Sequence, residues 1–226
     1  MVPRATDVGS PAERDLEELA RFCRHDLLEP IRTIAIGLDL LDAPDIDADE
    51  RVTLAAYMQS SVRGLDAVAR RLTEYLRLST AQPRSLELAD VVRTASAETA
   101  VRFPMVPLEI EAAPVRITAD PILICDMFTE LFDNAARHGA NGPSRRLIVS
   151  HDLVDDDQRL RIIEPGAQDW ADDASLIELF RAGRAGGTGG TGVGLAICRR
   201  ICELHGGGLR LLSSPEGPGV EIRLAR

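Results

Sequence analysis

Four polar side chains recur at spacings of three and four in the segment ELFDNAARHG, residues 130–139. Side chains at these spacings lie on one face of a helix. The face would carry an acid, an amide and two bases: Glu130, Asn134, Arg137 and His138. Hard oxygen ligands on one helix face, completed by phosphates and waters, suit Mg²⁺. The segment therefore predicts half of a magnesium–nucleotide site, and the structural alternative is an amphipathic helix with a polar solvent face.

A glycine-rich loop that runs directly into a helix could supply the other half. The segment GGTGVGLAI spans residues 189–197. Glycines let backbone amides approach phosphates, and a helix N-terminus adds a positive dipole end. The alternative interpretation is a flexible surface loop.

About a hundred residues upstream of the first segment, the sequence FCRHDLLEP places His25 and Asp26 side by side in a helical pattern. On its own, His25 would be an ordinary solvated histidine. A nucleotide site together with a presented histidine predicts phosphoryl transfer from ATP to histidine.

Two helices must present that histidine. Apolar residues recur at three and four from residue 12 to 41, with an expected kink at Pro30. A short turn at 43–48 leads to a second helix over about 49–79. A hairpin of this size has too little core to stand alone, and two hairpins can bury both apolar stripes in a four-helix bundle. We therefore expect a homodimer through residues 12–80.

Mixed helices and strands follow a linker at residues 81–85. The predicted fold class is α+β with two domains: a helical hairpin that forms a dimeric four-helix bundle, then an α/β sandwich that binds ATP. The expected domains are a disordered N-terminus at 1–12, a hairpin at 13–80 and an ATP-binding domain at 86–226. Within the last, helices are expected over 88–103, 119–139 and 192–205, strands over 108–112, 115–119, 145–154, 160–165, 208–214 and 220–226, and a mobile segment over 166–191.

The motifs, in this order and spacing, resemble the catalytic core of a two-component sensor histidine kinase. The resemblance covers residues 13–226 and implies a dimerisation and phosphotransfer hairpin followed by a Bergerat-type ATP-binding domain. The string HDLLEPIR is particularly similar to the phosphoacceptor box of phytochrome-like kinases. The resemblance implies that His25 accepts the phosphoryl group and that Asp26 orients its ring and takes its proton.

The resemblance also assigns the nucleotide site. It gives Asn134 to Mg²⁺ and Glu130 to Mg²⁺ or its water, directs Arg137 to the phosphates and sets His138 beside them. The remaining residues implied for nucleotide binding are Glu164, Gly166, Phe180, Arg181, Arg184, Gly190, Thr191, Gly192, Val193, Gly194 and Leu195.

Three positions depart from the family pattern. The family has a first glycine box, Asp-x-Gly-x-Gly, whose aspartate accepts the adenine amino proton. Here Glu164 replaces that aspartate, Gly166 is retained, and Gln168 replaces the second glycine of the box. These changes predict weak ATP binding with poor discrimination against GTP. Glu29 stands where the family usually has Thr or Asn for phosphatase activity, so a carboxylate there would repel an incoming aspartyl phosphate.

Composition restricts the partners. The net charge is −10, so nucleic acid is not expected as a partner. No apolar run reaches the length of a membrane span and the N-terminus has no signal-peptide pattern, so we expect a cytoplasmic protein. Four cysteines without a CxxC pair predict buried, reduced thiols.

The expected partners are a second copy of the chain, a response-regulator receiver domain that takes the phosphoryl group on aspartate, and an upstream sensor domain or protein. Neither a receiver nor a sensor pattern occurs in these 226 residues. Two other functions stay open. One is a histidine phosphotransfer relay with a degenerate ATP-binding domain, and the other is a dimeric scaffold that docks the receiver of another kinase.

Overall fold

The computed structural model describes residues 27–43, 45–138, 145–167 and 193–225. The chain divides into two compact units, residues 1–73 and 74–226, and each is described by itself. Among the described residues, no helix is both long enough and apolar enough to cross a bilayer.

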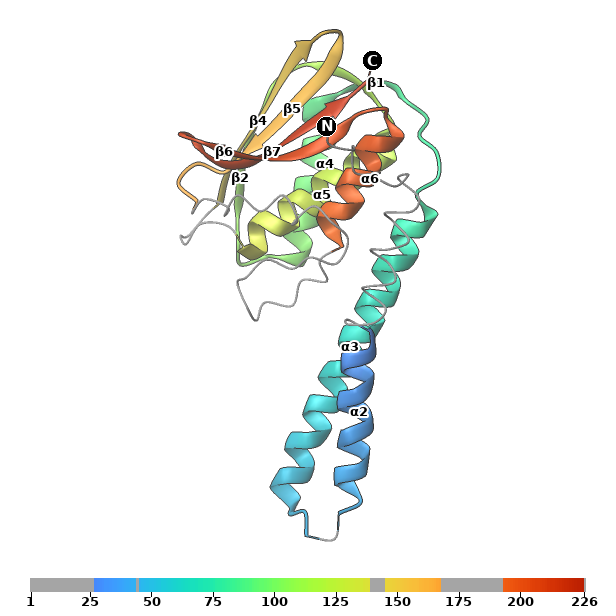
Figure 1. Ribbon diagram of the computed structural model, residues 1–226. Helices are drawn as coiled ribbons and strands as arrows, with labels where there is room; N and C mark the ends of the chain where they lie inside the picture. Colours follow the sequence, from blue (N-terminus) through green and yellow to red (C-terminus); the bar gives the residue numbers. More distant parts are fainter. Residues whose placement is uncertain (1–26, 44, 139–144, 168–192, 226) are drawn as a thin grey trace, which may run out of the picture. The chain divides into compact units, whose positions relative to one another are not determined.

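The first unit is a helical hairpin (Figure 1). Helix α2 spans Leu28–Leu41 and helix α3 spans Ala48–Arg77, although the last residues of α3 belong to the second unit. Helix α3 begins with a reciprocal cap, in which the Glu50 amide donates to the Asp47 carboxylate and the Asp47 amide donates to the Glu50 carboxylate. This arrangement satisfies two amides that a helix start leaves without partners. The upstream part of the helix predicted from residue 12 lies outside the described residues.

The second unit is built of three helices and seven strands among the described residues. Its elements are β1 (Arg84–Glu87), α4 (Leu88–Arg102), β2 (Leu108–Ala112), β3 (Arg116–Ala119), α5 (Pro121–His138), β4 (Arg145–Val154), β5 (Asp157–Ile163), α6 (Gly194–Leu204), β6 (Gly208–Ser214) and β7 (Gly217–Leu224). Strands β2-β4-β5-β7-β6 form a five-stranded sheet, in which only the β2–β4 pair is parallel. Strands β1 and β3 form a separate antiparallel pair.

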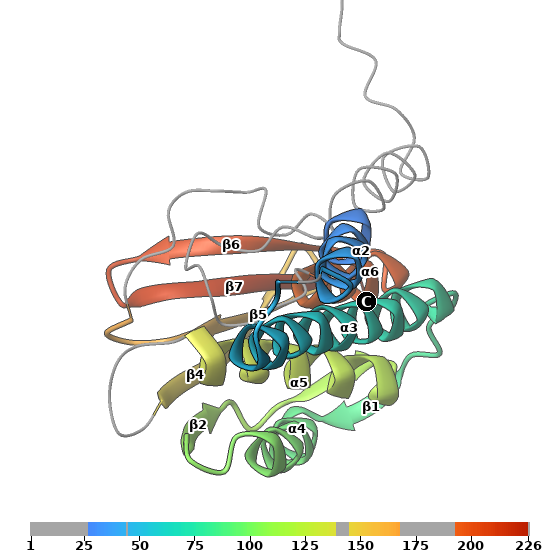
Figure 2. The same ribbon diagram turned by 90° about the horizontal axis from the view of Figure 1, so that it is seen from below.

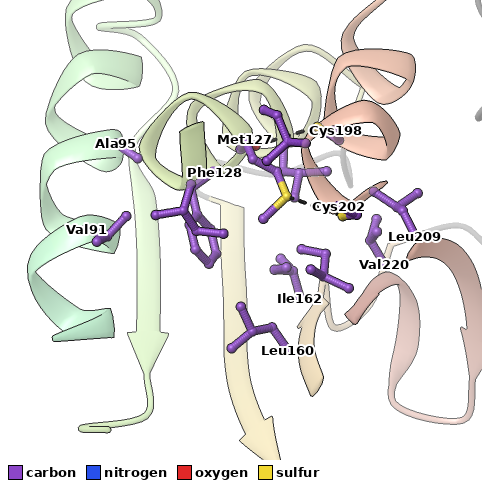
Figure 3. Packing of buried hydrophobic residues seen from close by; sticks show 14 of the residues in the cluster. Val91, Ala95, Met127, Phe128, Leu160, Ile162, Cys198, Cys202, Leu209 and Val220 are labelled. Carbon is purple, nitrogen blue, oxygen red and sulfur yellow. Dashed lines mark hydrogen bonds between the residues drawn. The ribbon is translucent and has the colours of Figure 1, made fainter. Parts of the chain in front are cut away.

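Helices α4, α5 and α6 cover one face of the five-stranded sheet (Figures 1 and 2). The strands alternate accordingly, as β5 shows, where Gln158, Leu160 and Ile162 are buried while Arg159 and Arg161 are partly exposed. Figure 3 shows the side chains that fill the space between the helices and the sheet. Phe128 and Phe132 of α5 have ring centroids 5.6 Å apart, and both are fully buried.

This architecture confirms the predicted α+β fold. Several element bounds differ from the expectation. Strands β5 and β7 each begin three residues before their predicted starts, at Asp157 and Gly217. Arg84 and Ser85, expected in a linker, lie in β1, because the chain here pairs with Ala119 and Thr118 of β3. Helix α6 begins at Gly194, two residues after the predicted start. Cys198 and Cys202 are buried thiols as predicted, whereas Cys125 is only partly buried and Cys23 lies outside the described residues.

Candidate functional site

Helix α5 carries the first predicted group of site residues. Asp120 caps it, because its carboxylate accepts hydrogen bonds from the amides of Ile122 and Leu123 at 3.0 and 3.2 Å. Pro121 at the first helical position has a backbone angle suited to a helix start. Apolar residues at helical spacing bury the opposite side of α5 against the core. Capping and packing together fix which face of α5 remains for chemistry.

Glu130 and Asn134 lie one turn apart on the side of α5 that meets the start of α6. A Cβ atom on Gly194 would stand 2.7 Å from Glu130 Oε2 and 3.6 Å from Asn134 Nδ2. A side chain at position 194 would therefore collide with the Glu130 carboxylate unless that carboxylate moved. The tertiary structure thus brings together the two segments that the sequence singled out separately.

The N-terminus of α6 lies close to Glu130 and Asn134. Val193, at the N-cap, is fully buried and makes no side-chain capping bond. The amides of the first helical turn have no acceptors within the helix itself. Such amides, at the positive end of the helix dipole, form a site suited to phosphate oxygens.

A buried carboxylate next to Asn134 was not predicted as important. Asp133 accepts a hydrogen bond from the Thr99 hydroxyl at 2.7 Å and pairs with Arg102 Nη1 at 3.1 Å. Both Thr99 and Asp133 are buried. These contacts join α4 to α5 and fix the rotation of α5 about its axis, and the sequence signal for them was a charged residue at an apolar position of an amphipathic helix.

The electrostatics of this face favour a cation. Burial raises the pKa of Asp126, and the negative charges of Glu98, Glu130, Glu74 and Asp120 raise it further. A positive ion near these carboxylates would relieve their mutual repulsion.

Glu164 follows the last residue of β5 and is 6% exposed. Its amide donates to the Pro218 carbonyl at 3.0 Å, and its own carbonyl accepts from the Ala167 amide at 3.3 Å. Gly166, in the turn that follows, has a positive φ of 77° that favours glycine. The retained glycine of this box therefore has a conformational reason.

Two basic residues end α5. The Arg137 guanidinium lies over the Phe103 ring, with Cζ 5.4 Å from the ring centroid, which directs it toward the segment after α4. Partial shielding of the His138 ring from water, and the neighbouring Arg137 charge, lower the pKa of His138. The uncharged form of the His138 ring is therefore favoured.

Leu195, in the first turn of α6, is partly buried against the core. The remaining predicted site residues lie outside the described residues. These are His25, Asp26, Phe180, Arg181, Arg184, Gly190, Thr191 and Gly192.

The residues present fit a magnesium ion that is mainly held by its nucleotide. Within the described ranges, no group of three or more His, Cys, Asp or Glu side chains is arranged to hold a metal. Mg²⁺ in nucleotide sites commonly takes only one or two protein ligands, with phosphates and waters completing its shell. Glu130 and Asn134, which lie close to Gly194 at the start of α6, meet that requirement.

Residues 119–226 match a family model described as histidine kinase-, DNA gyrase B- and HSP90-like ATPase. The chain is 27% identical over 209 residues to a bacteriophytochrome of Pseudomonas aeruginosa, and 29% identical over 211 residues to the C4-dicarboxylate transport sensor protein DctS of Rhodobacter capsulatus. These matches cover 88% and 86% of this chain, but only 28% and 31% of the relatives. The chain thus spans less than a third of the length of these relatives.

Solved structures share the fold. Histidine kinase AdeS of Acinetobacter baumannii matches with a TM-score of 0.57 at 18% identity, covering 89% of this chain and 97% of that one. Full-length ShkA, solved with AMPPNP, matches with a TM-score of 0.53 at 17% identity, covering 95% of this chain and 45% of that one.

Proposed function

We propose that this chain, a two-component histidine kinase catalytic core, binds ATP and transfers its γ-phosphoryl group to His25. Its residues 119–226 belong to the histidine kinase-, DNA gyrase B- and HSP90-like ATPase family. The observation that carries the proposal is the position of Gly194. An added Cβ there would stand 2.7 Å from Glu130 Oε2 and 3.6 Å from Asn134 Nδ2, so glycine lets the start of α6 lie directly against these two groups.

Each group has a role that follows from its chemistry. Glu164 accepts a hydrogen bond from the adenine amino group, and the first amides of α6 hold phosphate oxygens. Glu130 and Asn134 hold the magnesium ion. When bound, Mg²⁺ neutralises charge on the phosphates and orients them. Asp133, through Thr99 and Arg102, keeps Asn134 at this position without contacting the nucleotide.

His25 is the acceptor in this proposal. Its imidazole has one nitrogen that can carry the proton and one that can carry a lone pair. Asp26, adjacent in sequence, holds the proton on the far nitrogen and takes it as the N–P bond forms and the bond to the ADP oxygen breaks. The phosphohistidine then passes its group to an aspartate of a response regulator.

A phosphotransfer relay without ATP binding is the second candidate, because Glu164 and Gln168 depart from the family's adenine box. In that function only His25 reacts, and its phosphoryl group comes from a phosphorylated receiver domain.

Calorimetric titration with ATP and Mg²⁺ separates the two. If the protein is a kinase, the wild type should bind ATP in this titration, and Asn134→Asp should abolish the binding. Gln82→Glu, an amide-to-acid change on an exposed side chain before β1, is the matched control and should bind like the wild type. Absence of binding in the wild type would contradict the kinase proposal and favour the relay.

Labelling with ATP tests the acceptor. The wild type should gain an acid-labile label, and His25→Gln should gain none. His151→Gln, a histidine on β4, serves as the control and should label normally. Normal labelling of the His25→Gln protein would show that another residue accepts the phosphoryl group.

A further inference from the structure

The adenine-recognition residue of the proposed site is held in place by a strand distant in sequence. Strand β7 begins with the segment Gly217-Pro218-Gly219, which runs antiparallel to the end of β5. A Cβ on Gly217 would stand 2.4 Å from the Glu164 carbonyl oxygen and 3.2 Å from Pro165 Cα. Both are backbone atoms, so neither can move aside by a change of rotamer.

Gly217 also has a backbone conformation that other residues rarely adopt. Its φ is 140°, within the region that favours glycine. Its carbonyl accepts a hydrogen bond from the Ser214 hydroxyl at 2.8 Å, which fixes the turn between β6 and β7. Position 217 is thus constrained from the turn on one side and from Glu164 on the other.

The next contacts along the strand complete the constraint. The Pro218 carbonyl accepts from the Glu164 amide at 3.0 Å, and a Cβ on Gly219 would stand 2.3 Å from the Ile162 carbonyl oxygen. The backbone of β7 therefore lies directly against the backbone that leads to Glu164. A small displacement of β7 would move the Glu164 carboxylate by a similar amount, because Glu164 follows the last residue of β5.

We infer that Gly217 is a positioning residue for Glu164, and that the close approach of β7 sets where the Glu164 carboxylate meets the nucleotide base. Glutamate extends one methylene farther than the aspartate of the family, so its backbone must sit where the longer side chain can reach the same base edge. The part of the inference that concerns base selectivity rests on the proposed function. The part that concerns the position of Glu164 does not.

The test compares Gly217→Ala with Gly208→Ala. Gly208 lies at the start of β6, and an added Cβ there would meet nothing within 4 Å. Amide hydrogen exchange of the nucleotide-free protein is measured by NMR. In Gly217→Ala, the amides of Glu164 and Ala167 should exchange about tenfold faster or more, whereas core amides of β5 such as Leu160 keep their protection. Gly208→Ala should leave all of these rates unchanged.

The same proteins are then titrated with ATP and with GTP. Gly217→Ala should weaken ATP binding by about tenfold and shift the ratio of ATP to GTP affinity, while Gly208→Ala keeps the wild-type ratio. If Gly217→Ala does not fold, Ser214→Ala removes the bond to the Gly217 carbonyl without a clash, and should cause smaller changes of the same kind.

Wild-type exchange rates at Glu164 in a folded Gly217→Ala protein would overturn the inference. Uniformly faster exchange over β5 and β7 would also overturn it, since that pattern indicates general destabilisation. A changed exchange rate with an unchanged nucleotide ratio would overturn the role in base selectivity. If the wild type binds neither nucleotide, the proposed function fails, and the exchange comparison still decides whether Gly217 positions Glu164.

Discussion

At the scale of single residues, buried polar groups hold the surroundings of the site. Asp133 is buried beside Asn134, and a buried carboxylate is costly unless it is hydrogen-bonded and paired. Thr99 and Arg102 supply those interactions from α4. The result is a fixed register between the helix that carries Glu130 and Asn134 and the helix behind it.

Thr99→Val should destabilise the protein, because valine fills the same volume but leaves Asp133 without one hydrogen bond. The free energy of unfolding should fall by about 1–3 kcal/mol, measured by urea denaturation. Thr94→Val on the same helix is the control, since the Thr94 hydroxyl is exposed and bonds only the Asp90 carbonyl. Equal stability losses in the two variants would contradict the role given to Thr99.

A second charged group, Glu221 on the other face of the sheet, makes the stability of the fold depend on pH. Burial by itself raises the pKa of Glu221, but hydrogen bonds from Arg210 and Arg161, at 2.7 and 3.1 Å, lower it below its ordinary value of 4.5. The folded state therefore binds this proton less readily than the unfolded state. Glu221 stabilises the fold above pH 4.5, and this contribution is lost as the pH falls through the lowered value.

Glu221→Gln should therefore lower stability at neutral pH and matter progressively less as the pH falls below 4.5. Denaturation of both proteins from pH 7 to pH 3 measures the difference. Glu109→Gln on β2 is a control, since Glu109 is exposed and outside the Arg161–Glu221–Arg210 cluster. A stability difference that stays constant over this range would contradict the assignment.

At the scale of elements, the N-terminus of α5 joins three parts of the second unit. The Asp120 carboxylate accepts from the amide of Gln82, just after α3, at 2.8 Å, as well as from the first turn of α5. The Asp120 amide donates to Nε2 of the buried His205, which follows α6, at 2.9 Å. His205 Nδ1 lies 2.7 Å from the Ile201 carbonyl, so the neutral ring donates there and accepts at Nε2.

Asp120→Ala should loosen this junction. We expect a stability loss of about 0.5–2 kcal/mol, the cost of removing a helix cap, and faster proteolysis at residues 79–83, because the Gln82 amide loses its acceptor. Asp90→Ala on α4 is the control, since the exposed Asp90 side chain accepts a hydrogen bond from Arg93 on the same helix. Unchanged cleavage near Gln82 in Asp120→Ala would show that this bond does not hold the segment.

At the scale of the whole molecule, the helical hairpin exposes more apolar surface than a monomeric hairpin in water would tolerate. Large apolar side chains at about half exposure or more occur along both helices: Ile31, Ile36, Leu38, Leu40, Val52, Tyr57 and Val62. An open groove of about 460 Å³, lined by Ile34, Leu41, Ala55, Met58, Gln59, Val62 and Arg63, runs between α2 and α3. Burying such side chains gains about 1.5–3 kcal/mol each, which supports the homodimer that we propose through this hairpin.

Val62→Arg should therefore shift the protein from dimer to monomer, as measured by light scattering over a range of concentrations. Charge in an apolar interface is costly because the guanidinium loses water without gaining a partner. Val101→Arg on α4, where Val101 is 82% exposed, makes the same chemical change in the other unit and should leave the mass unchanged. A monomeric wild type would contradict the homodimer.

The sequence by itself determined the local elements and the family. Helical periodicity located α3 and α5, and alternation located β4 and β5, because these patterns arise from how a single segment buries one side. The order of the motifs predicted a sensor histidine kinase core, which the family model and the sensor relatives support, and the solved structures share its fold. Glu130 and Asn134 could be grouped because one helix carries both.

Only the tertiary structure decided contacts between residues that are far apart in sequence. The parallel pairing of β2 with β4, the Thr99–Asp133 bond, and the approach of Gly217 to Glu164 each join segments that have no local signal for one another. Side-chain period says which face is buried, but not which element covers it. For that reason Gly194 was recognised as part of a glycine loop, while its place in front of Glu130 and Asn134 followed only from the packing of α6 against α5.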